Sequence, residues 1–453
     1  MDKFSRRSFL KTTTTASTGL LFAPSLLSFS VNSKLNIAVI GVGNRGAYNL
    51  RAAAKNDTIV ALCDVDDRMM AKATANFPKA KTFRDFRVMF GKMANEIDAV
   101  VISTPDHTHF AATMAAMELG KHVYVEKPLA HNIWQLRTLK KAAMHYGIVS
   151  QMGNQGHTTH GIRLVKEWYD AGVIGEVKEV HAWRGVNVFK PNFYFSKPAH
   201  YPPLKETIPS ELDWDLWLGG TTFKDYNAIY TPKSWRGFYD FGSGQLGDWA
   251  CHTLDTPFWA LNLGMPYKVK ASIPKNAFND HSFIPDASTV TFYFKKRGKA
   301  PAVKLVWHEG FNKPNITIRP EWGIDKLPKA GMIMIGNKNS IITGGRPNDA
   351  RILVPYKEQQ KILRNAPKQT IKRIGEEQPH QEWIDAIKNN SLPGSNFNYS
   401  ADLTEFALIG VLAQRFGGKI KYDAKKMQIT NRKKLNAYIK EPVRANWSYG
   451  ENF

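Results

Sequence analysis

The chain has 453 residues, of which 43% are hydrophobic and 22% are charged, a balance that allows a buried core and excludes a mainly disordered protein. The length indicates two or three domains at about 150 residues per domain, and the sequence lacks the uninterrupted apolar runs of about 18 residues that a multi-span membrane protein needs. The 62 Lys and Arg residues outnumber the 39 Asp and Glu residues, which gives a net charge of +23. Because the basic residues are spread out and follow neither zinc-finger spacing nor basic-zipper heptads, we interpret the excess as a solvated surface and expect no nucleic-acid partner.

The first thirty residues are typical of an export signal. Residues 5–11 read Ser-Arg-Arg-Ser-Phe-Leu-Lys and precede a Thr-rich stretch and a mildly apolar run. A charged start before a short apolar segment is the layout of a secretory signal, and the heptamer resembles the twin-arginine export signal. We therefore predict a signal peptide over residues 1–33, cleaved between Pro24 and Ser33, and a periplasmic or otherwise exported protein. No Cys lies in that window, so we expect no stable membrane anchor.

A glycine-rich turn follows the first predicted strand. Residues 35–40 form a short apolar strand pattern, and residues 41–46 read Gly-Val-Gly-Asn-Arg-Gly and open a helical stretch. In this context G-x-G-x-x-G indicates a dinucleotide-binding fold. Gly41 permits the tight turn, Gly43 lets the backbone approach a pyrophosphate, and Gly46 lets the helix pack on the strand.

The acid at the end of the second predicted strand, 58–63, selects the cofactor. Asp64 can accept hydrogen bonds from both hydroxyls of the adenosine ribose and would repel a 2′-phosphate, so the sequence predicts NAD rather than NADP. The N-terminus of the helix supplies N–H donors for the phosphates. We include Asn44 and Arg45 of the same turn in the expected cofactor site.

Three further apolar runs predict strands at 99–103, 122–125 and 147–152, with helices at 108–119 and 133–145 between them. Repeated strand and helix units of this length indicate a parallel sheet. The sequence therefore predicts an N-terminal Rossmann dinucleotide-binding domain over residues 34–157. Ligands bind at the carboxyl ends of such strands, so Thr104, Pro105, Asp106, Glu126 and Lys127 should face the same crevice as the glycine turn.

The pattern changes past Gly175. Strand patterns at 288–294, 302–307 and 332–335 have no regular helices between them, which predicts a large, mainly antiparallel open sheet in a C-terminal α/β domain over residues 158–453. The two cysteines, Cys63 and Cys251, lie in apolar stretches far apart, and we expect buried thiols rather than a disulfide framework.

From Lys34 to about Met427 the chain resembles the Gfo/Idh/MocA oxidoreductases, named for glucose-fructose oxidoreductase and inositol dehydrogenase. The resemblance is carried by the glycine turn and by three segments, which read Thr-Pro-Asp-His-Thr-His at 104–109, Gly-Lys-His-Val-Tyr-Val-Glu-Lys-Pro at 120–128 and Gly-Ser-Gly-Gln-Leu-Gly-Asp-Trp-Ala-Cys-His-Thr-Leu-Asp at 242–255. Residues 151–157 and 397–405 resemble a secreted subgroup that is abundant in glycan-degrading bacteria. The resemblance implies a carbohydrate or cyclitol substrate and places His109, the His after Thr-Pro, near the cofactor. It also implies a second sheet that floors the active site and pairs subunits into a homodimer or homotetramer.

Three residues are the catalytic candidates. Asp248 and His252 are four residues apart and share a helix face, close enough for the carboxylate to orient the imidazole. Oxidation of a carbinol needs a base for the hydroxyl proton, and His is the natural one near neutral pH. Lys127, at a strand end beside the expected nicotinamide, can polarise the same oxygen. The resemblance implies that Lys127 and His252 act together and that Asp248 holds the substrate or the histidine; which of the two is the base stays open.

Further substrate contacts are expected from aromatic and cationic side chains. Five of the 12 tryptophans lie within 214–259, and aromatic faces suit sugar C–H surfaces. Trp235 and Arg236 are the best candidates, since an Arg would suit an acidic sugar. His157, in a Gly-rich loop near the expected crevice, is another candidate. His157 and His160 are three residues apart, but no third ligand is indicated, so we expect no metal site.

These observations predict an exported NAD-dependent sugar oxidoreductase that keeps and recycles its cofactor, since free NAD should be scarce outside the cytoplasm. One alternative is an NAD-dependent glycosidase that uses transient oxidation and elimination. A known glycosidase branch of the family departs from Glu-Lys-Pro, which this chain keeps at 126–128. The other alternative is a glycan-binding protein that has the fold without turnover.

Overall fold

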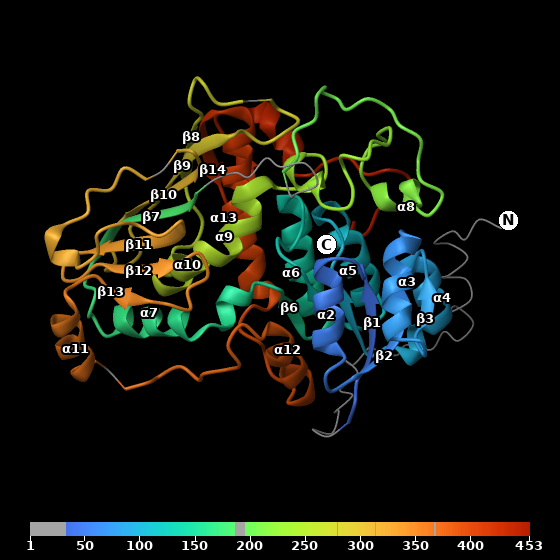
Figure 1. The fold of residues 1–453 in the computed structure, drawn as a ribbon, viewed down its shortest axis with the longest axis horizontal. Coiled ribbons are helices and arrows are strands. Elements are labelled where there is room, and N and C mark those ends of the chain that lie inside the picture. The colour runs from blue at the N-terminus through green and yellow to red at the C-terminus, as the bar shows by residue number, and fades with distance from the viewer. Residues whose placement is uncertain (1–32, 186–194, 279, 313, 367) are drawn as a thin grey trace.

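The computed structural model of the protein describes residues 33–185 and 195–453, apart from 279, 313 and 367. The predicted signal peptide lies outside the described residues, except for Ser33. Figure 1 shows a helix-flanked sheet built from the N-terminal part of the chain beside a second, larger sheet built from the later part. No helix in the described part of the chain has the length and apolar character needed to span a bilayer.

The N-terminal domain is built on a six-stranded parallel sheet in the order β3-β2-β1-β4-β5-β6, the strand order of a dinucleotide-binding fold. Its strands are β1 (Asn36–Ile40), β2 (Thr58–Cys63), β3 (Lys81–Phe83), β4 (Ala99–Ile102), β5 (His122–Val125) and β6 (Ser150–Met152). Its helices are α2 (Arg45–Ala53), α3 (Asp67–Asn76), α4 (Phe86–Met93), α5 (His109–Glu118) and α6 (Ile133–Tyr146). The fold class predicted for this half is confirmed.

The second domain is built on a nine-stranded sheet in the order β13-β12-β11-β7-β10-β9-β8-β14-β15. Neighbouring strands run antiparallel except β7 and β10, which run parallel. This confirms the predicted, mainly antiparallel open sheet. The strands are β7 (Val177–Gly185), β8 (Lys268–Ser272), β9 (Ala287–Phe294), β10 (Val303–Gly310), β11 (Ala330–Gly336), β12 (Ile341–Gly344), β13 (Arg351–Ile352), β14 (Gly418–Asp423) and β15 (Gln428–Ile429).

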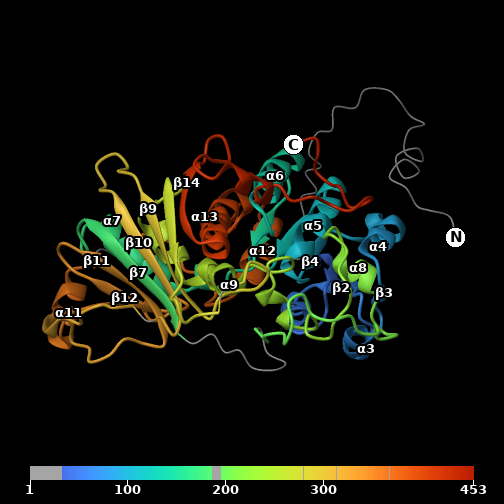
Figure 2. The ribbon, with the colours of Figure 1, turned by 90° about the horizontal axis from the view of Figure 1, so that it is seen from above.

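The helices of the second half are α7 (His160–Asp170), α8 (Trp214–Leu218), α9 (Gly244–Thr253), α10 (Asp255–Ala260), α11 (Tyr356–Arg364), α12 (Pro379–Lys388) and α13 (Phe397–Phe416). Helix α13 is buried along most of its length, as expected of a helix that is apolar all round. It packs against β8 and β9 of the large sheet on one side and against α6 of the N-terminal domain on another. Figure 2 shows it between the two sheets, so α13 is the shared core of the two domains.

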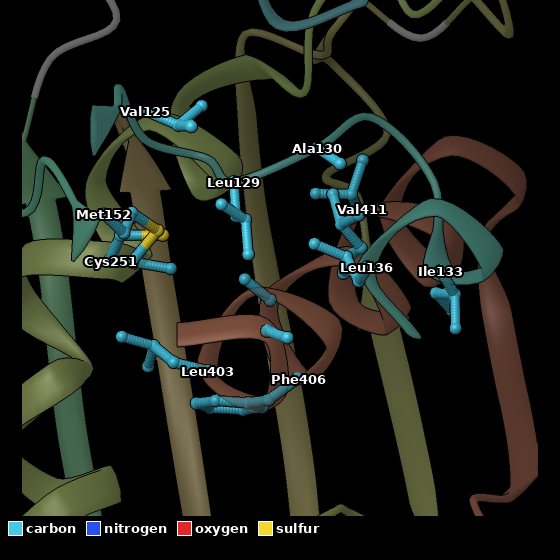
Figure 3. Close-up of a cluster of buried hydrophobic side chains, with 14 of the residues drawn as sticks. Val125, Leu129, Ala130, Ile133, Leu136, Met152, Cys251, Leu403, Phe406 and Val411 are labelled. Carbon is cyan, nitrogen blue, oxygen red and sulfur yellow. The ribbon is translucent and has the colours of Figure 1, made fainter. Parts of the chain in front are cut away.

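The contact between the domains has an apolar part. Figure 3 shows Met152 of β6 beside Cys251 of α9, with Leu403 and Phe406 of α13 below them and Leu129 above. Both cysteines are buried and free, as the sequence predicted. Burial raises the pKa of the Cys251 thiol to about 12, so it acts as a small hydrophobic side chain.

One helix from late in the sequence packs on the N-terminal domain. Helix α12 contacts α2, β5 and β6, and its Trp383 is fully buried in the core on that side of the parallel sheet. The ring of His380 in α12 stacks on Tyr124 of β5 at 4.2 Å between centroids. The side chain of His380 also lies 3.0 Å from Asn49 Oδ1 of α2. Residues assigned from sequence to the C-terminal domain thus complete the packing around the cofactor half.

Candidate active site

A cavity of about 420 Å³ opens where the carboxyl ends of the parallel strands face helix α9 and the end of β7. It is the place where parallel α/β sheets bind their ligands. Most of the residues predicted from sequence line it, namely Gly41, Gly43, Asn44, Arg45, Asp64, Thr104, Pro105, His109, Glu126, Lys127, Trp235, Arg236, Asp248 and His252. Gly46 and His157 do not line it.

The glycine turn places the start of α2 at the cavity. Gly41 has a φ of +81°, and a Cβ there would lie 2.8 Å from the carbonyl carbon of Ser103, so only glycine fits. A Cβ on Gly46 would lie 1.9 Å from the carbonyl oxygen of Gly41, which explains why Gly46 packs the helix and does not face the ligand. The side chain of Asn44, the N-cap of α2, makes no capping hydrogen bond, which suits a phosphate at this helix end.

Asp64 joins the second strand to the glycine turn. Its carboxylate accepts hydrogen bonds from the backbone N–H of Val42, at 2.8 Å, and of Asp66, at 3.0 Å. Burial raises the pKa of Asp64 to about 6 despite these two donors. On the other side of the glycine turn, the hydroxyl of Thr104 is buried and has no hydrogen-bond partner among the described residues. A glycine cradle, an acid beside it and an unpaired hydroxyl fit a dinucleotide cofactor.

Glu126 and Arg45 form an ion pair beside the glycine turn. Glu126 accepts hydrogen bonds from Arg45 Nε and from Asn49 Nδ2, both at 3.0 Å. Burial alone would raise the pKa of Glu126, but the charges of Arg45 and Lys127 outweigh it and hold the value at about 2. Glu126 is therefore ionised and holds the side chain of Arg45 in place. In this way it helps to shape the part of the cavity next to the glycine turn.

The reacting end of the cavity is built around Asp248. Its carboxylate accepts a hydrogen bond from Lys127 Nζ, and Arg236 Nη1 lies 3.2 Å from it and 3.3 Å from Asp106. Burial alone would raise the pKa of Asp248, but Arg236 and then Lys127 reverse the effect and hold it well below its usual range. Asp106 is in turn fixed by the Ser243 hydroxyl at 2.8 Å, so both acids and both cations are held in place.

His252 is 2% exposed and lines the cavity next to this network. Among the described residues, the expected hydrogen bond from its imidazole to Asp248 does not form, and Lys127 and Arg236 both contact Oδ1 of that carboxylate. The Nδ1 atom of His252 has no hydrogen-bond partner among the described residues. Burial, and then the charges of Lys127 and Arg346, lower the pKa of His252 well below its usual value. The ring is therefore neutral and able to accept a proton.

The two other candidate histidines, His109 and His157, form hydrogen bonds that hold other parts of the structure together. His109 is buried, and its Nδ1 and Nε2 lie 2.8 Å from the carbonyl oxygen of Pro128 and 2.9 Å from that of Thr104, so it ties two cavity loops together. The Nδ1 of His157 lies 3.0 Å from Asp255, and Tyr399 donates to the same acid. His157 lies behind α9, not in the cavity, because its ring is drawn to this buried carboxylate.

Aromatic side chains also line the cavity. Of the five tryptophans within 214–259, Trp217, Trp235 and Trp249 line the cavity. Trp214 stacks under Trp217 at 4.6 Å, and Trp259 lies 5.3 Å from the ring of His157. Trp214 and Trp259 do not line the cavity.

Asp106, which was expected to face the crevice, lines the cavity. The polar wall residues that were not candidates from sequence include Arg184 and Arg346. Arg184 ends a strand that the sequence did not reveal, and Arg346 follows two glycines after β12. Neither arginine stands out among the many surface cations.

Comparisons with known proteins agree with this architecture. Residues 35–154 match the oxidoreductase family Gfo/Idh/MocA, NAD-binding Rossmann fold, and residues 159–284 match the C-terminal alpha/beta domain of the same oxidoreductase family. The chain belongs to the Gfo/Idh/MocA family. Residues 35–154 accordingly form an NAD-binding domain, as the glycine turn and Asp64 predicted.

Curated relatives match part of the chain. A glycosyl hydrolase family 109 protein of Solibacter usitatus is 32% identical over 199 residues, which are 39% of this chain and 45% of that protein. Inositol 2-dehydrogenase of Pseudomonas fluorescens is 26% identical over 205 residues, 44% of this chain and 59% of that enzyme. Levoglucosan dehydrogenase of Pseudarthrobacter phenanthrenivorans is 26% identical over 233 residues, 49% of this chain and 50% of that enzyme. The chain thus matches about half the length of these relatives.

Solved structures show the same fold over a larger share of the chain. The WlbA dehydrogenase of Chromobacterium violaceum, solved with NADH and UDP-GlcNAcA, has a TM-score of 0.62 at 17% identity and covers 88% of this chain and 99% of its own. A levoglucosan dehydrogenase solved with NADH has a TM-score of 0.57 at 17% identity and covers 85% of this chain and 99% of its own. At these identities the likeness is one of fold.

Proposed function

We propose that the protein oxidises or reduces a carbinol of a carbohydrate or cyclitol with NAD as its redox partner. The observation that carries the proposal is the juxtaposition of Lys127, Asp248 and a neutral, buried His252 in the cavity that the glycine turn also lines. NAD, when bound, would supply the hydride chemistry. The inositol and levoglucosan dehydrogenases among the relatives support this substrate class.

The residues divide the proton chemistry between them. His252 accepts the proton of the reacting hydroxyl, because its low pKa keeps the imidazole neutral. Lys127 donates a hydrogen bond to the same oxygen and is positioned for this by Asp248. Asp248 is hydrogen-bonded to Lys127 and acts on His252 only through its charge, and these contacts support our proposal that His252 is the base.

Replacement of either proton-handling residue tests the proposal. Lys127→Ala and His252→Ala should each lower the rate of substrate oxidation by about 10²-fold or more while NAD binds as in the unchanged protein, since neither residue belongs to the glycine turn. The control is His160→Ala, because His160 lies outside the cavity and contacts the carbonyl of Ile374. A near-normal rate in the His252→Ala protein would show that the base is another group.

The pH profile provides a second readout. Because the pKa of His252 is held well below its ordinary value of 6.5, the base stays unprotonated as the pH falls to 6. We therefore expect protonation of His252 to change kcat/KM little between pH 8 and pH 6. The decrease in kcat/KM that protonation of His252 causes should occur below pH 6. A loss of rate centred on the ordinary histidine pKa would contradict the assignment.

A second candidate function is an NAD-dependent glycosidase, favoured by the 32% identity to a glycosyl hydrolase family 109 protein. The same base would serve a transient oxidation, after which the glycosidic group leaves by elimination, water adds and the sugar ketone is reduced again. The two functions differ in their products. A released aglycone with no net redox change in the sugar indicates the glycosidase, and an oxidised or reduced sugar indicates the dehydrogenase.

We also propose that the protein is exported by the twin-arginine route, on the strength of Arg6 and Arg7 within residues 5–11. Replacing both by Lys should leave folded protein in the cytoplasm, because that route reads the arginine pair. Unchanged export of the double variant would point to another route.

A further inference from the structure

Arg184 is held beside the reacting centre by stacking. It lies near the end of β7, and its guanidinium carbon is 3.7 Å from the centroid of the Trp249 ring. Trp249 follows Asp248 in α9, and its ring lies 5.7 Å from that of His252. Both Arg184 and Trp249 line the cavity, so the cation is within the space that a substrate would share with the base.

Arg184 differs from the neighbouring cations in its partners. Lys127 is paired with Asp248, Arg236 lies between Asp106 and Asp248, and Arg346 Nη1 is 3.0 Å from Glu377. No carboxylate of the described residues pairs with Arg184. Burial lowers the pKa of Arg184; the charge of Asp248 opposes this effect, and the charge of Arg346 adds to it. Arg184 is thus a half-buried cation that no carboxylate in the described part of the chain contacts directly, which is unfavourable.

Arg346 adds an unsatisfied donor to the same wall. Its Nε is buried and has no hydrogen-bond partner among the described residues. The loop that carries it is fixed under α9, since the Thr253 hydroxyl donates to the carbonyl of Gly345 at 2.8 Å and a Cβ on Gly345 would lie 3.0 Å from the Trp249 ring. The two arginines therefore lie close enough for their charges to interact, and Arg346 has an N–H group that lacks an acceptor among those residues.

We infer that the substrate is an acidic sugar and that Arg184, assisted by Arg346, binds its carboxylate. The inference rests on the proposed function and deepens it by naming the substrate class. A stacked guanidinium is weakly hydrated and presents a rigid fork that matches a planar carboxylate. Arg236, the arginine that the sequence indicated for an acidic sugar, lies between two buried carboxylates and instead positions Asp248.

The test uses the full chain saturated with NAD and measures binding by calorimetry. The probes are D-glucuronate and D-galacturonate, each compared with its hexuronamide, which has the same shape without the charge. We expect each uronate to bind about tenfold or more tightly than its amide and Arg184→Gln to reduce this advantage to about threefold or less. Arg184→Lys, which keeps the charge but loses the fork, should give an intermediate advantage. The matched control is Arg319→Gln, since Arg319 also lies over a tryptophan, Trp322 at 5.4 Å, but outside the cavity.

Several results would overturn the inference. These are uronates that bind no better than their amides, an advantage that survives in Arg184→Gln, or a hexose 6-sulfate that binds more tightly than every uronate. Following the nicotinamide absorbance of the same samples separates this inference from the proposed function. Neutral hexoses oxidised as well as the uronates would contradict the carboxylate site and leave the dehydrogenase standing. Uronate binding through Arg184 without any absorbance change would support the site and contradict the dehydrogenase.

Discussion

Asp64 shows how one side chain serves both the fold and cofactor choice. Its carboxylate holds the glycine turn through Val42 N–H and lines the cavity at the position expected for a ribose. We predict that Asp64→Ala weakens NAD binding and narrows the preference for NAD over NADP, because it removes ribose acceptors and a charge that repels phosphate. Titration of NAD and of NADP into the unchanged protein and into Asp64→Ala measures the four affinities.

Asp64→Asn separates the two effects, since it keeps the shape and one acceptor but removes the charge. It should accept NADP better than the unchanged protein while retaining more NAD affinity than the alanine variant. Equal affinities for both cofactors in the unchanged protein and in Asp64→Ala would show that the acid does not select NAD.

Several site residues could be predicted because their signals are local. Lys127 and His252 lie in contiguous segments with a recognisable order, and the turn at 41–46 needs glycine for steric reasons. The partner of Asp248 could not be predicted, because helical spacing identifies His252 as a neighbour on the same face but does not show that Lys127 arrives from another domain. The positions of Arg184 and Arg346 could not be predicted, because only the fold brings these two cations from separate segments to the cavity that Trp249 also lines.

At the scale of elements, strands that are buried along their whole length could be predicted from the sequence, whereas some partly exposed strands could not. Strand β4 is fully buried and reads as an apolar run, so it was predicted closely. Strand β3 has three residues, two of them exposed, and has no such run. Strand β7 mixes buried and exposed positions without regular alternation, because a loop with Trp322 covers part of its outer face near Trp183. The packing of α12 on the N-terminal domain is a long-range contact that no local pattern encodes.

Strand β10 carries a buried acid that should make stability depend on pH. Glu309 accepts hydrogen bonds from Trp307 Nε1, at 2.9 Å, and from Gln414 of α13. Burial nevertheless raises its pKa from 4.5 to about 7. The folded state then binds a proton that the unfolded state releases above pH 4.5. Its contribution is therefore complete below that pH and is lost as the pH rises through about 7.

We predict that the free energy of unfolding falls between pH 5 and pH 8 by on the order of 2 to 3 kcal/mol through this group and that Glu309→Gln flattens the decline. Denaturant unfolding at several pH values measures it. Glu321→Gln, at an exposed position, is the control. An unchanged slope in Glu309→Gln would show that Glu309 titrates normally.

At the scale of the whole molecule, export and cofactor use are linked. A protein exported folded could carry NAD with it, and NAD that cannot be exchanged must be regenerated on the enzyme, so the overall reaction would be a closed cycle. We predict that NAD survives purification without being added and that turnover proceeds without external NAD. Protein that is empty after purification and works only with stoichiometric NAD would contradict the closed cycle and leave the oxidoreductase intact.

The most direct test of the central proposal, that Lys127 and His252 serve NAD-dependent chemistry at a sugar carbinol, is a panel of neutral and acidic sugars, cyclitols and glycosides mixed with the NAD-loaded protein. Nicotinamide absorbance and product mass are followed together. The account predicts an absorbance change with at least one acidic sugar, a product that differs from it by a pair of hydrogens, and the loss of both signals in His252→Ala. Sugars that bind in the cavity without any absorbance change or altered product would contradict it.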